Sequence, residues 1–251
     1  MSGEARVALV TGASSGIGQA SAIELARRGY RVAVHYFANE KGAGETVRSI
    51  SDENGEAVAF KADMRSSSKI RNMVSEVVAK LGRIDCLVNN AGSLVARSPF
   101  LEMSDDYWDE VFKLNVHSVF VCTQEVARIM TTQKQGIVIN VSSIAARHGG
   151  GPGAIAYAAA KGAVLTLTKG LAKELAPFGI RVNGVAPGVI LTPFHERFTS
   201  TEQMKKMVDM IPLRYAGTPQ ETATVVAFLA SNDSRYLTGE TIEVNGGLLM
   251  D

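Results

Sequence analysis

The sequence predicts an α/β fold in which helices cover both faces of a parallel sheet. Short apolar runs alternate with longer stretches of helical periodicity along the chain, and this alternation is typical of parallel sheets. A glycine-rich turn joins the first apolar run to the first helical stretch. We therefore expect a doubly wound, Rossmann-like three-layer sandwich with a mostly parallel, seven-stranded sheet. No repeat, linker or low-complexity segment interrupts the 251 residues, so we expect a single domain over 1–251.

Composition narrows the classes of partner. Hydrophobic residues make up 46% of the chain, charged residues 20%, and the net charge is +1, which argues against nucleic acid or a membrane surface as a partner. No apolar run approaches the ~20 residues of a membrane helix, and residues 1–6 lack the pattern of a signal peptide. Cys86 and Cys122 lie in apolar segments without metal-like spacing. We expect a cytoplasmic protein without a bound metal whose cysteines are buried free thiols, a disulfide being the alternative.

The first strand is expected at residues 6–11, and the turn that follows reads TGxxxGxG before a helix that Gly29 closes. Glycines let the backbone approach a pyrophosphate, and the following helix N-terminus supplies N–H donors. The alternative is an ordinary glycine-rich turn. We predict that a dinucleotide contacts this loop through Gly12, Ser14, Ser15, Gly16, Ile17 and Gly18.

The second strand is expected at residues 31–36. A preference for NAD requires an acidic residue near the end of this strand, where it binds the ribose 2′-hydroxyl. Tyr36 stands there, and the first carboxylate, Glu40, comes after the strand. Asn39 and Lys41 could instead contact a 2′-phosphate. We therefore predict that Tyr36 and Asn39 lie at the cofactor and that NADP is preferred, with NAD as the alternative.

A helix at 40–54, a strand at 58–62 and a helix at 67–81 are expected next. Asp63 and Met64 follow the third strand, where the carboxylate either accepts a hydrogen bond from adenine or serves as a turn or N-cap residue. A fourth strand leads into residues 89–92. We predict a structural role for Asn89 and cofactor contacts for Asn90, Ala91 and Gly92.

Residues 105–131 are expected to form one long helix, with Asn115 inside an apolar stretch. A buried amide without partners costs about 1–3 kcal/mol. Asn115 therefore either makes a structural hydrogen bond to a neighbouring strand or marks a kink that holds a water beside an active site.

The fifth strand is expected at 137–142, and Ser143 stands at its carboxyl end, where ligands bind in open α/β sheets. The alanine-rich helix expected at 155–176 carries Tyr157 and Lys161, which are i and i+4 and share a face. Such a pair also arises by chance. A nearby cation lowers the pKa of a phenol, so Tyr157 is a candidate general acid/base. We expect the sheet to cover this helix on one side and a second subunit on the other.

The sixth strand, at 180–186, leads to a turn with Pro187 and Gly188 at the same sheet edge. Residues 194–212 are rich in methionine and polar side chains and are expected to form a small mobile lid, spanning about 190–215, over a substrate. The alternative is a surface helix without ligand contact. A helix at 219–231 and a last strand at 241–244 complete the chain.

Four segments together resemble the short-chain dehydrogenases/reductases: residues 11–18, residues 89–92, Ser143 with Tyr157 and Lys161, and Pro187–Gly188. Within that family the chain is similar to bacterial 3-oxoacyl-[acyl-carrier-protein] reductases and to sugar and small-ketone dehydrogenases. The resemblance covers essentially the whole chain.

The resemblance implies a set of roles. Tyr157 would transfer the proton at the substrate oxygen, which Ser143 would hold. Lys161 would lower the pKa of Tyr157 and bind the nicotinamide ribose, and Asn115 would hold a water linked to Lys161. Further cofactor contacts would come from Asp63, Met64, Asn90, Ala91, Gly92, Tyr157, Lys161, Pro187, Gly188, Ile190 and Thr192.

The function implied is an NADP(H)-dependent oxidoreductase that acts on a carbonyl or secondary alcohol (EC 1.1.1.-) and reduces, in one reading, a 3-oxoacyl thioester. The alternatives are a sugar or small-ketone dehydrogenase and a non-catalytic NADP-binding sensor. The expected partners are a small-molecule substrate and copies of the chain in a homotetramer.

Overall fold

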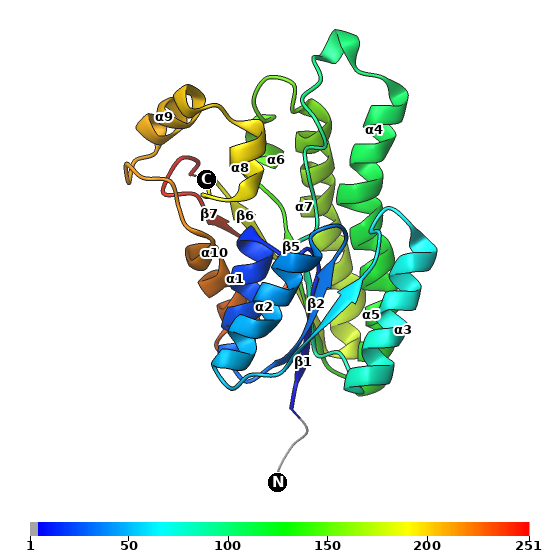
Figure 1. The fold of residues 1–251 in the computed structure, drawn as a ribbon. Coiled ribbons are helices and arrows are strands. Elements are labelled where there is room, and N and C mark those ends of the chain that lie inside the picture. Colours follow the sequence, from blue (N-terminus) through cyan, green and yellow to red (C-terminus); the bar gives the residue numbers. More distant parts are fainter. Residues whose placement is uncertain (1–4, 251) are drawn as a thin grey trace.

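In the described part of the chain, seven strands form one sheet in the order β3-β2-β1-β4-β5-β6-β7 (Figure 1). The structure is a computed structural model that describes residues 5–250. Every strand pairing is parallel, so the fold is the predicted Rossmann-like one, with a fully parallel sheet. The strands are β1 (Val7–Val10), β2 (Arg31–Tyr36), β3 (Ala57–Lys61), β4 (Cys86–Asn89), β5 (Gly136–Val141), β6 (Ile180–Pro187) and β7 (Thr241–Val244).

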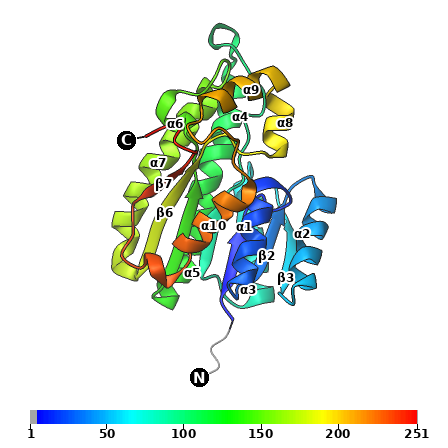
Figure 2. The same cartoon turned by 90° about the vertical axis from the view of Figure 1, so that its left-hand side faces the viewer.

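Helices cover both faces of the sheet, as Figures 1 and 2 show. One face carries α1 (Gly16–Arg27), α2 (Glu40–Asp52) and α10 (Pro219–Leu229), and the other carries α3 (Ser67–Leu81), α5 (Ser118–Gln133) and α7 (Ile155–Leu175). Successive residues of β1 enter the two cores alternately, Val7 and Leu9 into one and Ala8 and Val10 into the other, because strand side chains point to opposite faces in turn.

Shorter helices stand above the carboxyl ends of the strands (Figure 1). They are α6 (Ala145–His148), α8 (Pro193–Phe198) and α9 (Thr201–Met210). The segment predicted at 194–212 is therefore two helices, because Ser200 starts a new one with a capping box to Gln203. Single 3₁₀ turns complete the elements at Phe100–Glu102, Ala176–Phe178 and Asn232–Ser234.

The single helix predicted at 105–131 was wrong in its continuity. The structure has α4 (Asp105–Phe112), a π-helical turn at Lys113–His117, and then α5. Asn115 lies in the π turn, and its Nδ2 donates to the Val111 carbonyl at 2.9 Å. π turns of this kind insert one residue into a helix and are frequent at functional sites.

Two further observations concern the cysteines and the helices. Cys86 and Cys122 are both buried and unpaired, which confirms the predicted free thiols. Between residues 5 and 250, no helix has the length and apolar character that crossing a membrane requires.

Candidate active site

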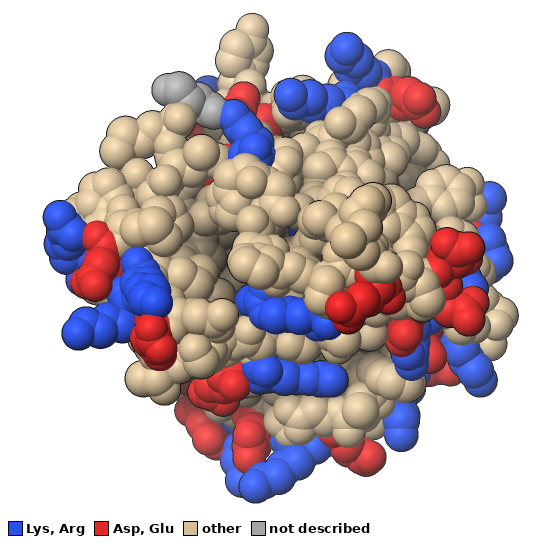
Figure 3. Space-filling view, turned by 90° about the horizontal axis from the view of Figure 1, so that it is seen from above, with Lys and Arg blue, Asp and Glu red and all other residues tan. Residues whose placement is uncertain are grey.

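A cleft of about 1190 Å³ opens at the carboxyl edge of the sheet. Seen from above, uncharged side chains form most of this surface, and basic and acidic side chains lie next to one another just below its centre (Figure 3). The cleft brings together most of the predicted site residues: Gly12, Ser14, Ser15, Gly16, Ile17, Asn39, Asp63, Met64, Asn90, Ala91, Gly92, Ser143, Tyr157, Lys161, Pro187, Gly188, Ile190 and Thr192. Gly18, Tyr36 and Asn115 are not part of its wall.

Two side chains hold the glycine loop. The Gly12 N–H donates to Nδ1 of His35 at 2.9 Å, and His35 Nε2 lies 3.1 Å from the Ala62 carbonyl. Since Nδ1 accepts, the proton must be on Nε2, which donates to Ala62. Asn90 donates from Nδ2 to the carbonyls of Thr11 at 2.9 Å and Gly12 at 3.1 Å. Asn90 therefore shapes the loop as well as lining the cleft.

The glycines of the loop have different tasks. Gly12 and Gly16 have φ of +65° and +55°, a left-handed backbone that favours glycine. A Cβ on Gly18 would collide with the Gly12 carbonyl, so this residue serves the packing of α1 against the loop rather than the wall. No side chain caps the N-terminus of α1. Gly16 and Ile17 at this end of α1 line the cleft, and a helix N-terminus suits a pyrophosphate.

The end of β2 differs from the prediction in one respect. Tyr36 is only 9% exposed and packs in the core on the α1 and α2 face, so the cofactor contact predicted for it is not supported. Phe37 and Ala38 line the cleft instead. Asn39 accepts from the Gly42 N–H at 3.0 Å as the N-cap of α2 and donates to the Ser14 carbonyl at 3.1 Å.

Arg65 occupies the same end of the cleft, although it comes from the turn after β3. Its guanidinium binds both carboxylate oxygens of Asp63, at 2.9 and 3.0 Å, and reaches Glu110 at 2.9 Å. It also lies 5.1 Å from the centre of the Phe37 ring. These hydrogen bonds lower the pKa of Asp63. The turn role considered for Asp63 is present, since its carboxylate accepts from the Arg65 N–H.

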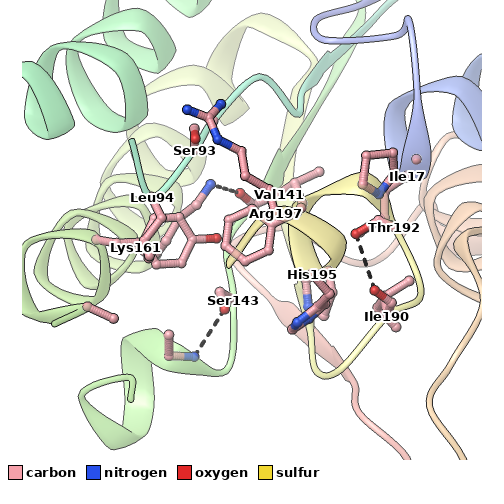
Figure 4. Close-up of a pocket in the computed structure, with 18 of the residues that line it drawn as sticks. Ile17, Ser93, Leu94, Val141, Ser143, Lys161, Ile190, Thr192, His195 and Arg197 are labelled. Atoms are coloured by element: carbon pink, nitrogen blue, oxygen red, sulfur yellow. Dashed lines mark hydrogen bonds between the residues drawn. The ribbon is translucent and has the colours of Figure 1, made fainter. Parts of the chain in front are cut away.

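Ser143, Tyr157 and Lys161 all line the cleft, and Figure 4 labels Ser143 and Lys161 there. β5 delivers Ser143, whose Oγ accepts from the Ala145 N–H at 3.1 Å. The Tyr157 ring lies 5.8 Å from that of Phe194. Lys161 is buried, donates from Nζ to the Val141 carbonyl at 2.7 Å, and lies 5.6 Å from the centre of the Tyr157 ring.

The ionisation of this group departs from the prediction. Burial raises the pKa of Tyr157 to about 12, against a hydrogen bond with Ser143 that lowers it. Burial also lowers the pKa of Lys161 to about 8. The expected lowering of the Tyr157 pKa is absent because desolvation outweighs the hydrogen bond with Ser143.

Asn115 lies behind the wall and is fully buried. Its Oδ1 accepts from the Ser93 N–H at 3.1 Å, and Nδ2 donates to the Ser93 carbonyl at 2.9 Å. A Cβ built on Gly92 would lie 2.6 Å from Oδ1 of Asn115 and 3.2 Å from Nζ of Lys161. Asn115 is thus hydrogen-bonded to the loop after β4 rather than to a neighbouring strand, directly beside the buried lysine. The water expected there stays a prediction.

The far side of the cleft is mainly apolar. The loop after β4, the helices α8 and α9, and the C-terminal segment contribute Leu94, Phe194, Met207, Met210, Leu248 and Leu249. The Thr192 hydroxyl donates to the Ile190 carbonyl at 3.2 Å. The sequence did not predict His35, Arg65, Leu248 and Leu249 as cleft residues, because only the folded chain brings them there. Within residues 5–250, no three His, Cys, Asp or Glu side chains are grouped as metal ligands.

The sequence of this chain matches those of known proteins over almost its whole length. A family model described as enoyl-(acyl carrier protein) reductase matches residues 12–249. A 3-oxoacyl-[acyl-carrier-protein] reductase of Staphylococcus epidermidis is 41% identical over 97% of this chain and 98% of the relative. One from Thermotoga maritima is 40% identical over 98% and 99%.

A solved structure agrees with these relatives. The crystal structure of acetoin dehydrogenase from Enterobacter cloacae matches with a TM-score of 0.88 and 37% identity, over 97% of this chain and 95% of that one. Together with the glycine loop and the meeting of Ser143, Tyr157 and Lys161 in one cleft, these matches establish that the chain belongs to the short-chain dehydrogenase/reductase family.

Proposed function

We propose that this protein is an NADP(H)-dependent oxidoreductase that transfers a hydride between the nicotinamide and a carbonyl or secondary alcohol substrate. The observation that carries the proposal is the position of the Tyr157 phenol. It lies in the same cleft as the glycine loop, with Ser143 and Lys161 beside it. All three side chains and Asn115 are present, which argues against a sensor that binds the dinucleotide without catalysis.

The nicotinamide supplies or accepts the hydride when it is bound. In the reductive direction, Tyr157 donates its proton to the substrate oxygen. Ser143 donates a hydrogen bond to the same oxygen and stabilises the charge that develops on it. Lys161, when protonated, places a positive charge 5.6 Å from the centre of the phenol ring, which offsets part of the desolvation cost of the phenolate left after transfer.

The dinucleotide site follows the cleft from the glycine loop. The α1 N-terminus and residues Gly12, Ser14, Ser15, Gly16 and Ile17 would hold the pyrophosphate. Asp63, Met64, Asn90, Ala91 and Gly92 would face the adenosine side, and Pro187, Gly188, Ile190 and Thr192 the nicotinamide carboxamide. Each of these residues lines the cleft.

The preference for NADP over NAD rests on the end of β2. No carboxylate of β2 faces the cleft there: Tyr36 is in the core, and Phe37, Ala38 and Asn39 line the wall. Arg65 offers a guanidinium over Phe37, and the two nearest carboxylates, Asp63 and Glu110, are both paired with it. Because Asp63 and Glu110 neutralise Arg65, the preference for NADP rests on the lack of a carboxylate at the end of β2.

We propose a 3-oxoacyl thioester as the substrate class, with a small ketone or sugar as the alternative. The curated relatives are reductases of 3-oxoacyl groups on an acyl carrier protein, and the apolar far side of the cleft suits an acyl chain. The match to acetoin dehydrogenase supports the small-ketone alternative.

The decisive experiment compares the wild type with Tyr157→Phe, using NADPH or NADH with acetoacetyl thioesters, simple diketones and sugars. Loss of the proton donor should lower kcat by about a hundredfold or more, since general acid catalysis contributes roughly 10²–10⁴-fold. The dissociation constant for NADPH, measured by nucleotide fluorescence, should change little. Near-normal turnover of Tyr157→Phe would refute the mechanism, and equal kcat/KM with both nucleotides would refute the NADP preference.

We further infer a single cytoplasmic domain that assembles as a homotetramer. The outer surface of α4 and α5 supports the assembly, since Trp108 and Phe120 are 36% and 44% exposed there.

We also propose that residues 190–215 act as a mobile lid. The helices α8 and α9 stand over the cleft and contribute Phe194, Met207 and Met210 to its wall.

A further inference from the structure

Two arginines of the cleft have no carboxylate partner. Arg97 comes from the loop after β4 and Arg197 from α8, and both line the far side of the cleft and are exposed. Among residues 5–250, no carboxylate lies within ion-pair distance of either guanidinium. The other exposed cations of the wall are neutralised: Lys206 pairs with Glu202 at 2.7 Å, and Arg65 pairs with Asp63 and Glu110.

Arg97 is held in place by uncharged groups. Its Nη1 donates to the Pro152 carbonyl, at 2.6 Å, and its Nε donates to the Phe198 carbonyl at 2.9 Å. These bonds join three segments around the cleft: the loop after β4, the glycine-rich turn before α7, and the end of α8. They leave Nη2 of a fixed guanidinium without a partner, and an ordered guanidinium suits a carboxylate or phosphate.

A series of neighbouring aromatic rings lies between Arg197 and the reacting phenol of Tyr157. The rings of Tyr157 and Phe194 lie 5.8 Å apart, those of Phe194 and Phe198 5.1 Å apart, and the Arg197 guanidinium lies 5.0 Å from the Phe198 ring. The positive charge of Arg97 also acts on His195: burial lowers the pKa of His195, and the charge of Arg97 lowers it further. Both carboxylates of the wall, Asp63 and Glu110, lie with Arg65 at the opposite, adenosine end.

We propose that Arg97 and Arg197 bind an anionic group of the substrate, a phosphate or carboxylate, at a distance from the carbonyl that Tyr157 protonates. The proposal rests on the proposed carbonyl reduction and narrows its substrate to molecules with a remote negative charge. Such a charge has two sources: the phosphates of a pantetheine-type thioester, or the carboxylate of a keto acid. A neutral sugar or diketone lacks this group.

The test uses matched substrates that differ only in the charge. Acetoacetyl-4′-phosphopantetheine is compared with acetoacetyl-pantetheine, which lacks the phosphate, and 5-oxohexanoate with its methyl ester. In the wild type, kcat/KM should favour one anionic member by about tenfold or more, mainly through KM, since charge-assisted hydrogen bonds are strong. Arg197→Gln should reduce this ratio about tenfold and Arg197→Lys much less. Arg48→Gln removes an exposed charge of α2 outside the cleft and should leave the ratio unchanged.

The substrate pair whose kcat/KM ratio falls in Arg197→Gln identifies the source of the negative charge, phosphate or carboxylate. A ratio near one in the wild type, or a ratio that Arg197→Gln does not move, would overturn the proposal even if all four ketones are reduced. Calorimetric titration of coenzyme A and of 5-hydroxyhexanoate into the NADPH-loaded protein separates the two hypotheses. Binding that Arg197→Gln weakens, without turnover of any ketone, would support the anion site while refuting the proposed reduction.

Discussion

At the scale of single residues, His35 controls the shape of the cofactor loop. It is 1% exposed, accepts from the Gly12 N–H and donates to the Ala62 carbonyl, so it joins the glycine loop to the turn after β3. Burial lowers the pKa of His35 to about 4, outweighing the Ala62 hydrogen bond and the charge of Asp63, which raise it. Protonation would turn the acceptor Nδ1 into a donor facing the Gly12 N–H.

This coupling predicts a pH dependence of stability. The folded-state pKa is below the unfolded value of 6.5, so the neutral imidazole stabilises the fold fully above pH 6.5, and this contribution is lost as the pH falls toward 4. The loss amounts to about 3 kcal/mol, taking 1.36 kcal/mol per pKa unit. Urea unfolding from pH 7 to 4 should show a steeper fall for the wild type than for His35→Asn. Parallel curves would contradict the assignment.

At the scale of elements, the π turn between α4 and α5 places Asn115 against the loop after β4. The side chain bonds both backbone groups of Ser93, and Gly92 passes close enough that Asn115 and Lys161 both lie next to it. Three segments distant in sequence, those of Gly92, Asn115 and Lys161, thus meet beside the ammonium of the buried lysine. A side chain on Gly92 cannot be accommodated without moving one of them.

Gly92→Ala tests this arrangement. The added methyl would stand 2.6 Å from Asn115 Oδ1 and 3.2 Å from Lys161 Nζ, so we expect kcat to fall about tenfold or more and the midpoint of thermal unfolding to decrease by several degrees, as overpacking costs about 1–3 kcal/mol. Gly44→Ala is the matched control, since its Cβ meets nothing within 4 Å in α2. It should stabilise the protein by about 0.5–1 kcal/mol. Normal activity of Gly92→Ala would show that the close approach is not needed.

At the scale of the whole molecule, the outer face of α4 and α5 is the surface best suited to a second subunit. Phe112, Val116 and Phe120 line a shallow hollow there, and Trp108 stacks on Phe112 with ring centres 4.7 Å apart. Large apolar side chains gathered on one helix face are typical of interfaces. This face lies outside the cofactor cleft, so assembly leaves the cleft open.

Phe120→Glu should dissociate the proposed tetramer. A carboxylate would then have to be buried in an apolar interface, which costs several kcal/mol per ion. Multi-angle light scattering at micromolar protein should show a shift from four subunits to two or one. Leu101→Glu, at an exposed position on the loop before α4, is the control and should leave the mass unchanged. A tetramer that survives Phe120→Glu would exclude this face.

Much of the fold follows from the chain itself. The alternation of strand and helix patterns and the TGxxxGxG turn predicted the parallel sheet and the position of the cleft, because such patterns depend on local periodicity and on glycine conformation. Helix 67–81 and strand 241–244 have the predicted ends. The meeting of Ser143, Tyr157 and Lys161 was predictable once the family resemblance placed their segments at one sheet edge.

Only the tertiary structure decided how the side chains share their partners. The Tyr36 side chain is buried in the core, and Phe37 lines the wall of the cleft. Arg65, which follows β3, lies beside Phe37 at the end of β2. Burial, rather than the i and i+4 spacing, determined the pKa values of Tyr157 and Lys161. Sequence patterns report which face of an element a residue occupies, whereas desolvation and hydrogen bonds between distant segments exist only once the elements are packed.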